Sequence, residues 1–183
     1  ALRAAIAAFD GCALRDTATN LVFAEGNAHS GMLIIGDPPG SDEDRGGHPF
    51  AGPLGNLLDR MLGSIRLERS GLLLTPLIPW RPPGGRVPSP AEVTLCLPFL
   101  HRLIALTAPR RIVLFSTQGA RVLLPAATGR RRPSATWVET TFPGAHLPIP
   151  VLSLPGLDAI QKTANARRDA WAALDEPGAI ASV

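Results

Sequence analysis

Four short apolar runs alternate with helical patterns along the chain. The runs cover residues 32–35, 72–78, 111–115 and 149–154, and each is short enough to be a buried parallel strand. Between the first two runs, apolar residues recur at helical spacing at Leu54, Leu57, Leu58, Met61 and Leu62. The alternation predicts an α/β domain of three layers, with a central parallel sheet of about four strands and helices on both faces.

The remaining segments carry further helix signals. Ser89, Pro90 and Glu92 form a capping-box start with proline at the first helical position, and Pro98 is expected to bend the helix that follows. Other elements are predicted as helices at 2–9, 118–124 and 158–174 and as a small ribbon at 137–142. In such an open α/β sheet, ligands are expected at the carboxyl ends of the strands.

Length and composition fit one folded domain. The chain has 183 residues, 45% of them hydrophobic, and we expect one domain over 1–176 and a loosely ordered tail over 177–183. The formal net charge is +3, and nearly all the positive residues are arginine, which suits phosphate contacts. No apolar run approaches the roughly 20 residues that span a bilayer, and no leader is visible. We therefore expect a cytoplasmic, nucleoid-associated monomer.

The loop after the first predicted strand holds the candidate chemistry. Gly36 closes the strand, and Pro38 and Pro39 cannot continue it because proline lacks the N–H of a sheet ladder. An acidic loop at 41–44 is then expected to lead to Phe50 and the next helix. A carboxylate and an aromatic ring should therefore lie near one strand end.

This stretch carries a family resemblance. Residues 36–59 resemble the first signature of family-4 uracil-DNA glycosylases, G-E-x-P-G-x-x-E-D-x-x-G-x-P-F-x-G-x-x-G-x-L-L-D, and residues 22–27 resemble the V-F-G-E-G-N arm of that family. Asp37 stands where the family has its catalytic Glu. The resemblance implies a uracil-DNA glycosylase-like fold and an enzyme of base-excision repair that hydrolyses the N-glycosidic bond of a flipped base. It implies Asp37 as the catalytic residue and a base-binding set of Gly36, Pro38, Gly40, Phe50, Pro76 and Leu154.

Two departures from the family affect the base pocket. Pro76 replaces an Asn that pairs with the uracil edge in the family, and Leu154 replaces the His of its H-P-S motif. Asn and His side chains donate hydrogen bonds, whereas Pro and Leu side chains do not. We therefore expect an apolar pocket, closed by Pro76 and Leu154, that binds uracil weakly.

Two further departures affect the cluster site of the family. Of the four cysteines that hold a four-iron cluster in the family, Cys12 and Cys96 remain, and Phe9 and Trp80 occupy the other two positions. The rings are expected to fill the volume of the cluster, and the two cysteines should lie near each other. We expect no metal, so the purified protein should be colourless and free of iron.

DNA, single- or double-stranded, is the implied partner. The resemblance assigns to DNA binding the residues Arg81, Arg86, Pro155, Gly156, Leu157, Lys162 and Arg168, with Leu157 as a wedge into the duplex. The arginine cluster at 130–132 fits solvated surface or a phosphate contact about equally well.

Two functions of different class fit these residues. One is a divergent DNA glycosylase that uses Asp37, Phe50 and backbone amides, acting on uracil with weakened activity or on another base, with His48 as a further candidate for catalysis. The other is a non-catalytic relative that keeps the DNA-facing fold and serves as a binding or accessory protein in repair. An exposed loop position is the simpler interpretation of His48.

Overall fold

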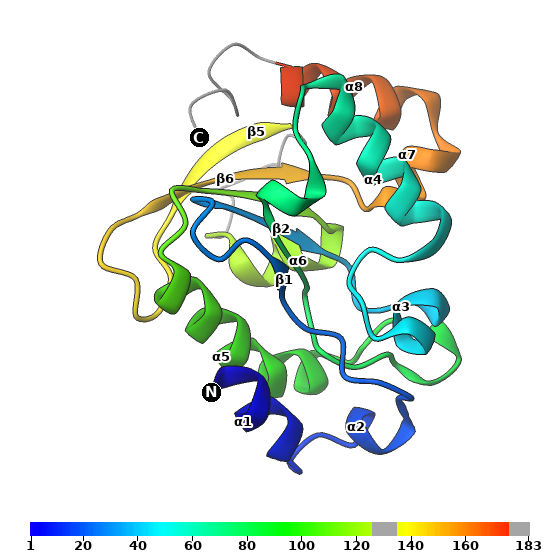
Figure 1. The fold of residues 1–183 in the computed structure, drawn as a ribbon, viewed down its shortest axis with the longest axis vertical. Helices are drawn as coiled ribbons and strands as arrows, with labels where there is room; N and C mark the ends of the chain where they lie inside the picture. Colours follow the sequence, from blue (N-terminus) through cyan, green and yellow to red (C-terminus); the bar gives the residue numbers. More distant parts are fainter. Residues whose placement is uncertain (126–134, 176–183) are drawn as a thin grey trace.

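The computed structural model describes residues 1–125 and 135–175. Its centre is a six-stranded sheet with the order β1-β3-β2-β4-β6-β5 (Figure 1). The four inner strands are parallel: β3 (Leu73–Pro76), β2 (Met32–Gly36), β4 (Arg111–Phe115) and β6 (Ile149–Leu154). These four confirm the predicted parallel sheet.

Two antiparallel edge strands raise the strand number above the predicted four. The strand β1 (Glu25–Gly26) pairs with β3, and β5 (Thr136–Thr140) pairs with β6. The predicted ribbon at 137–142 is therefore part of the main sheet. β1 was not predicted because two residues are too few to show a strand period.

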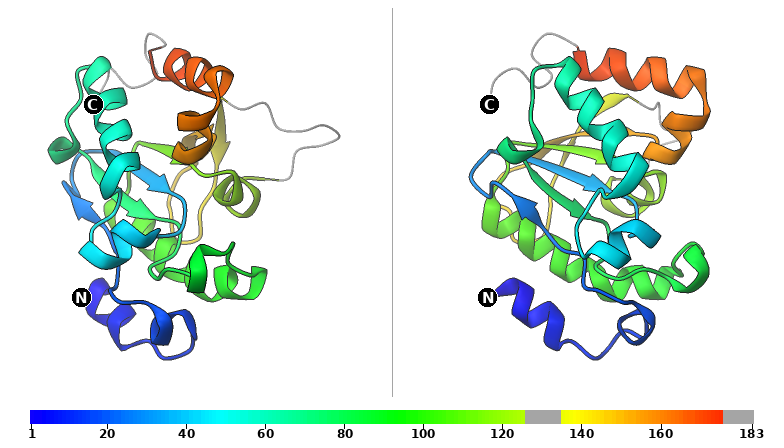
Figure 2. Two further views of the ribbon diagram at one scale, coloured as in Figure 1. Left: turned by 90° about the vertical axis from the view of Figure 1, so that its right-hand side faces the viewer. Right: turned by 45° about the vertical axis from the view of Figure 1, so that its right-hand side comes forward.

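Helices cover both faces of the sheet, which confirms the three layers (Figure 2). One face packs against α1 (Leu2–Ala8), α2 (Leu14–Thr17), α5 (Pro90–Thr107) and α6 (Thr117–Leu123). The other face packs against α4 (Gly52–Ser64), α7 (Leu157–Lys162) and α8 (Ala164–Asp175). Alternation along β2 divides the core in two, since Leu33 and Ile35 point to the first face and Met32 and Ile34 to the second.

The segment predicted as an acidic loop is a helix, α3 (Ser41–Gly46), so that prediction was wrong. Its first turn is closed by Glu43, whose Oε2 accepts a hydrogen bond from the backbone N–H of Gly40 at 3.0 Å. It ends at Gly47, which adopts the left-handed conformation with φ of 73°. Asp44 is buried, and its Oδ1 accepts hydrogen bonds from the backbone N–H groups of Thr19 and Asn20 at 2.8 and 3.1 Å.

The predicted closing helix is two helices, α7 and α8. Thr163 between them has an extended conformation, which interrupts the helix. Threonine is also one of the residues preferred at the cap position before a helix. The second predicted strand ends at Pro76, after which the N–H of Leu77 still donates to the carbonyl of Gly36 at 2.9 Å. Helix α5 continues through Pro98. Short turns at Arg69–Gly71 and Pro83–Gly85 complete the described elements.

None of the helices within 1–125 and 135–175 combines the length and apolar character that a bilayer crossing needs.

Candidate functional site

A cavity of about 360 Å³ lies at the carboxyl ends of the inner strands. It is lined by Gly36 at the end of β2 and Asp37 just after it, by Pro76 from β3 and Phe115 from β4, and by Leu157 and Asp158 at the start of α7. The chain runs from β2 to β3 on one side and then crosses to β4 on the other, so the cavity lies at the switch point where open α/β sheets bind ligands.

Asp37 is held by a neighbour that sequence reasoning missed. Gly36 and Phe115 are paired in register, so the next residues along the two strands, Asp37 and Ser116, lie side by side. The hydroxyl of Ser116 donates a hydrogen bond to Asp37 Oδ1 at 2.5 Å and accepts one from the backbone N–H of Gly119 at 2.9 Å. These two bonds fix the carboxylate against the first turn of α6.

The surroundings of Asp37 change its acidity. Asp37 is exposed to solvent as a residue, but protein atoms surround its carboxylate, and the partial loss of hydration raises the pKa of Asp37. The hydrogen bond from Ser116 acts in the opposite direction and lowers the pKa, and the negative charge of Asp158 adds to the rise. Asp37 is therefore a carboxylate that accepts a proton more readily than an ordinary aspartate.

Phe50 forms a wall of the cavity and is 7% exposed. Its ring lies so close to Gly36 that a Cβ there would meet two ring carbons at 2.7 Å. Its backbone is left-handed, with φ of 53°, which is uncommon outside glycine. Gly36 and Phe50, both predicted as base-binding residues, are thus in direct contact.

Arg69 holds the loop that carries Phe50. Its Nη1 donates to the carbonyls of Phe50 and Pro49 at 2.9 and 3.3 Å, and its Nη2 donates to the carbonyl of Gly55 at 3.1 Å. The guanidinium also donates to Asp59 Oδ1 at 2.8 Å. No sequence motif marked Arg69, because its partners lie ten to twenty residues away and are mostly backbone carbonyls.

The predicted base-binding residues are mostly brought together. Gly36, Pro38, Gly40, Phe50 and Pro76 all line the cavity, as does Glu43, whose pKa is raised by burial. Leu154 does not line it; the side chain is 2% exposed and packs in the core with α4, α7 and α8. The prediction that Leu154 closes the pocket was therefore wrong, and Leu157 takes that place.

The predicted DNA wedge also differs. Leu157 is 5% exposed, packs in the core and lines the cavity, so it does not protrude as a wedge. Pro155 before it is half-buried. Gly156 is buried beside the site, since a Cβ there would come 2.3 Å from Asp37 Oδ2. Of these three residues, Leu157 lines the cavity and Gly156 lies against Asp37.

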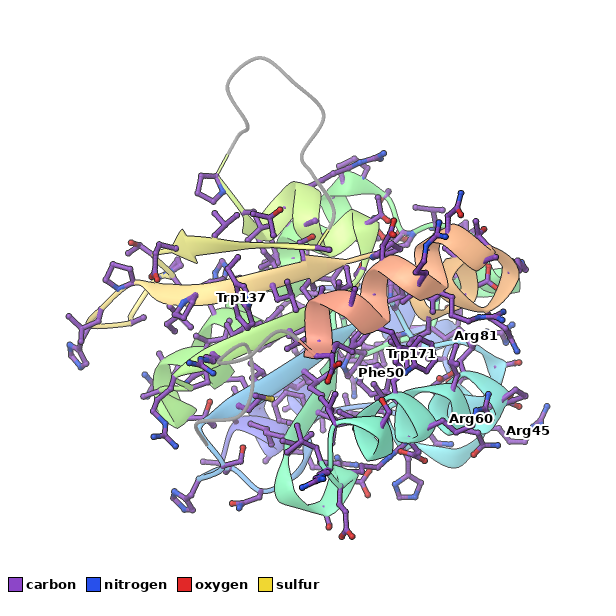
Figure 3. All side chains as sticks on the ribbon, turned by 90° about the horizontal axis from the view of Figure 1, so that it is seen from above. Arg45, Phe50, Arg60, Arg81, Trp137 and Trp171 are labelled. Atoms are coloured by element: carbon purple, nitrogen blue, oxygen red, sulfur yellow. The ribbon has the colours of Figure 1, made fainter. Side chains whose placement is uncertain are left out.

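Three of the four charged side chains predicted to bind DNA contact neighbouring side chains of the protein. Arg86 Nη2 pairs with Glu92 Oε1 at 2.6 Å, Lys162 Nζ with Asp158 Oδ2 at 2.8 Å, and Arg168 Nη2 donates to Asn165 Oδ1 at 2.7 Å. Arg81 Nε has no hydrogen-bond partner among the described residues. Figure 3 shows Arg81 on the same side as Arg45 and Arg60, with Phe50 and Trp171 nearer the centre of the view.

Another sequence candidate, His48, lies away from the cavity. His48 Nδ1 is 2.9 Å from Glu25 Oε2 on the surface, and His48 does not line the cavity. The structure therefore gives His48 a surface hydrogen bond with Glu25 in place of a role in the site. The arginine cluster at 130–132 lies outside the described residues.

The residues at the cluster positions form apolar core. Cys12 and Cys96 are both buried in one hydrophobic cluster with Trp80, which is 2% exposed. Burial, and then the adjacent Cys12 thiol, raise the pKa of Cys96, so the two cysteines are neighbours as predicted. Phe9 packs against this cluster and meets the edge of Phe99 with ring centroids 5.1 Å apart.

These residues do not fit the iron–sulfur cluster of the resembled family. Such a cluster is held by four thiolates, and only Cys12 and Cys96 are present in the sequence. Among the described residues, no group of three or more His, Cys, Asp or Glu side chains is placed to hold a metal ion.

Comparison with known proteins agrees with the fold. The family model described as the uracil DNA glycosylase superfamily matches residues 23–175. A type-4 uracil-DNA glycosylase of Pyrobaculum aerophilum is 37% identical over 67% of this chain and 62% of its own length. A type-4 uracil-DNA glycosylase of Archaeoglobus fulgidus is 38% identical over 61% of this chain and 56% of its own length. The matched part thus spans about 60% of these relatives. The match over residues 23–175 shows that the chain belongs to the uracil-DNA glycosylase superfamily.

Proposed function

We propose that the chain is a DNA N-glycosylase of base-excision repair, with Asp37 as its catalytic carboxylate. The observation that carries this proposal is the position of Asp37. It lines a cavity at the strand ends, accepts a hydrogen bond from Ser116, and shares the cavity with the ring of Phe50. The relatives named as type-4 uracil-DNA glycosylases support the same class of reaction.

The proposed reaction starts with a nucleotide flipped out of the DNA stack into the cavity. Phe50 stacks on the base, because an aromatic face suits any base ring. As the N-glycosidic bond breaks, positive charge develops on the sugar, and the Asp37 carboxylate stabilises that charge. Ser116 keeps the carboxylate pointing into the cavity throughout.

Uracil excision is expected to be slow. A neutral uracil leaves as an anion, which a hydrogen-bond donor stabilises, and loss of one such donor elsewhere costs on the order of 10²- to 10³-fold in rate. Pro76 and Leu154 supply no donor, and Leu154 is turned into the core. We therefore propose that the slow step of uracil excision is the departure of the base.

The proposal includes DNA as partner and no iron–sulfur cluster. Arg81 lies on the side of the molecule that also carries Arg45 and Arg60 (Figure 3). Arginines gathered on one side suit the phosphate backbone. We propose that the domain binds DNA there as a monomer, and that apolar packing around Trp80 replaces the cluster.

One observation favours a second candidate, a non-catalytic DNA-binding protein of repair. Among the residues that line the described cavity, no side chain donates hydrogen bonds. A site that cannot bind uracil specifically would still leave the DNA-facing surface intact. In this case the cavity is a remnant of the enzyme.

The two candidates are separated by incubating an excess of protein with uracil-containing single-stranded and duplex oligonucleotides, while binding is measured by mobility shift. The proposed glycosylase should release uracil slowly but above the protein-free background. Binding of both oligonucleotides with no release at enzyme excess would favour the accessory protein.

The pH dependence of base release should report on the neighbours of Asp37. The reaction needs ionised Asp37, so the rate falls as pH decreases through its pKa. Ser116→Ala removes the bond that lowers this pKa, so the acid limb should move to higher pH. Asp158→Asn removes the charge that raises it, so the limb should move to lower pH.

The measurement is single-turnover base release across the acid range, with Thr117→Ala as the matched hydroxyl control next to Ser116. The control should leave the limb in place, because Thr117 is exposed at the start of α6. Shifts of Ser116→Ala and Asp158→Asn in the same direction would rule out this account of the carboxylate.

A further inference from the structure

The lining of the cavity is unusual in its hydrogen-bonding groups. Four of its residues, Pro38, Pro39, Pro49 and Pro76, have neither a backbone N–H nor a polar side chain. Its three polar side chains are Asp37, Glu43 and Asp158, and an ionised carboxylate only accepts hydrogen bonds. The described walls thus offer acceptors and negative charge but no donor side chain.

Some backbone donors at the cavity are already bonded or lie beside a negative charge. The N–H of Gly40 is already bonded to Glu43 Oε2 at 3.0 Å. The first residues of α7, Leu157 and Asp158, carry N–H groups that a helix leaves without intrahelical partners. At the start of α7, however, the side chain of Asp158 is a carboxylate, which repels the negative charge that develops on a departing neutral base. Its ion pair with Lys162 at 2.8 Å offsets part of this charge.

This lining is suited to a base that carries positive charge. A neutral base departs as an anion, and the described cavity has no side chain to stabilise an anion. A cationic base departs as a neutral molecule and needs no such donor. The ring of Phe50 and the carboxylates both attract a cationic ring before the bond breaks.

We propose that the preferred substrate of this site is DNA that contains a purine made cationic by alkylation of a ring nitrogen. This inference rests on the proposed function, because it names the base that the glycosylase takes. A cavity of about 360 Å³ lies within the range of pockets for small organic ligands, so its size admits a two-ring base.

The reaction balances without any further reagent. The bond between the sugar C1′ and the purine nitrogen breaks, and both electrons pass to the base, which neutralises its ring. The oxygen of a water molecule forms the new bond to C1′. The proton lost by this water passes to the Asp37 carboxylate and then to solvent.

The test uses two duplexes of one sequence, one treated with dimethyl sulfate and one containing uracil, each incubated with the full chain. Released 7-methylguanine, 3-methyladenine and uracil are measured by chromatography, and spontaneous release without protein is subtracted. The methylated purines should be released on the order of tenfold faster than uracil, or more.

Two variants test the role of the charge. Asp158→Asn should lower the ratio of methylpurine to uracil release, because it removes negative charge from the cavity. Asp169→Asn makes the same change on the exposed surface of α8 and should leave the ratio unchanged.

The outcomes separate this inference from the proposed function. Uracil released at the rate of the methylated purines or faster would overturn the preference for a cationic base and leave the glycosylase proposal standing. Release of none of the bases would overturn both. An unchanged ratio in Asp158→Asn would also overturn the role of charge in the preference.

Discussion

Replacing Trp80 by alanine is expected to lower the free energy of unfolding by about 3–5 kcal/mol, the usual cost of removing a large buried aromatic ring. Trp80 is 2% exposed and packs in one cluster with Cys12 and Cys96. Its ring occupies a position where the resembled family has a cluster ligand. The loss should therefore appear as a cavity in the core between α1, α5 and the sheet.

Thermal unfolding measures this loss, and for a chain of this length it corresponds to a decrease in Tm of roughly 6–20 °C. Trp171→Ala is the matched control, because Trp171 on α8 is half-buried and its Nε1 donates to Ser64 Oγ at 3.0 Å. The control should destabilise less. A decrease for Trp80→Ala no larger than that of the control would show that the ring does not support this part of the core.

The sheet could be predicted from the sequence because its signal is local. The runs at β2 and β4 are short, apolar and bounded by glycine, proline or polar residues, and burial on both faces accounts for their continuous hydrophobicity. The helix α3 had only half of a capping-box signal, since Glu43 follows Gly40 by three residues but glycine has no side chain to complete the box. Acidic and glycine residues dominate the segment, and that composition favours a loop.

The contacts of the site could not be predicted from local patterns. Ser116 and Asp37 are 79 residues apart and meet only because β2 and β4 pair in register. Arg69 is placed by backbone carbonyls, which any sequence provides. Leu154 shows the limit of a family resemblance, since a matched position does not fix the direction in which a replaced side chain points.

Asp37→Asn is expected to lower single-turnover base release by on the order of 10²- to 10³-fold, the cost typical of removing one preorganised electrostatic group. Asparagine keeps the shape of the side chain, and its carbonyl oxygen still accepts the hydrogen bond from Ser116. The variant therefore removes the negative charge that stabilises the developing sugar cation and leaves the surrounding structure in place. DNA binding should persist, since Asp37 lies inside the cavity.

The most direct test of the proposed site is the single-turnover rate of base release by Asp37→Asn, measured beside Asp169→Asn and the unchanged protein on the same DNA. We predict a loss on the order of 10²-fold or more for Asp37→Asn and an unchanged rate for Asp169→Asn, with equal DNA binding by all three proteins. Base release by Asp37→Asn at the rate of the unchanged protein would contradict the assignment of Asp37 as the catalytic carboxylate.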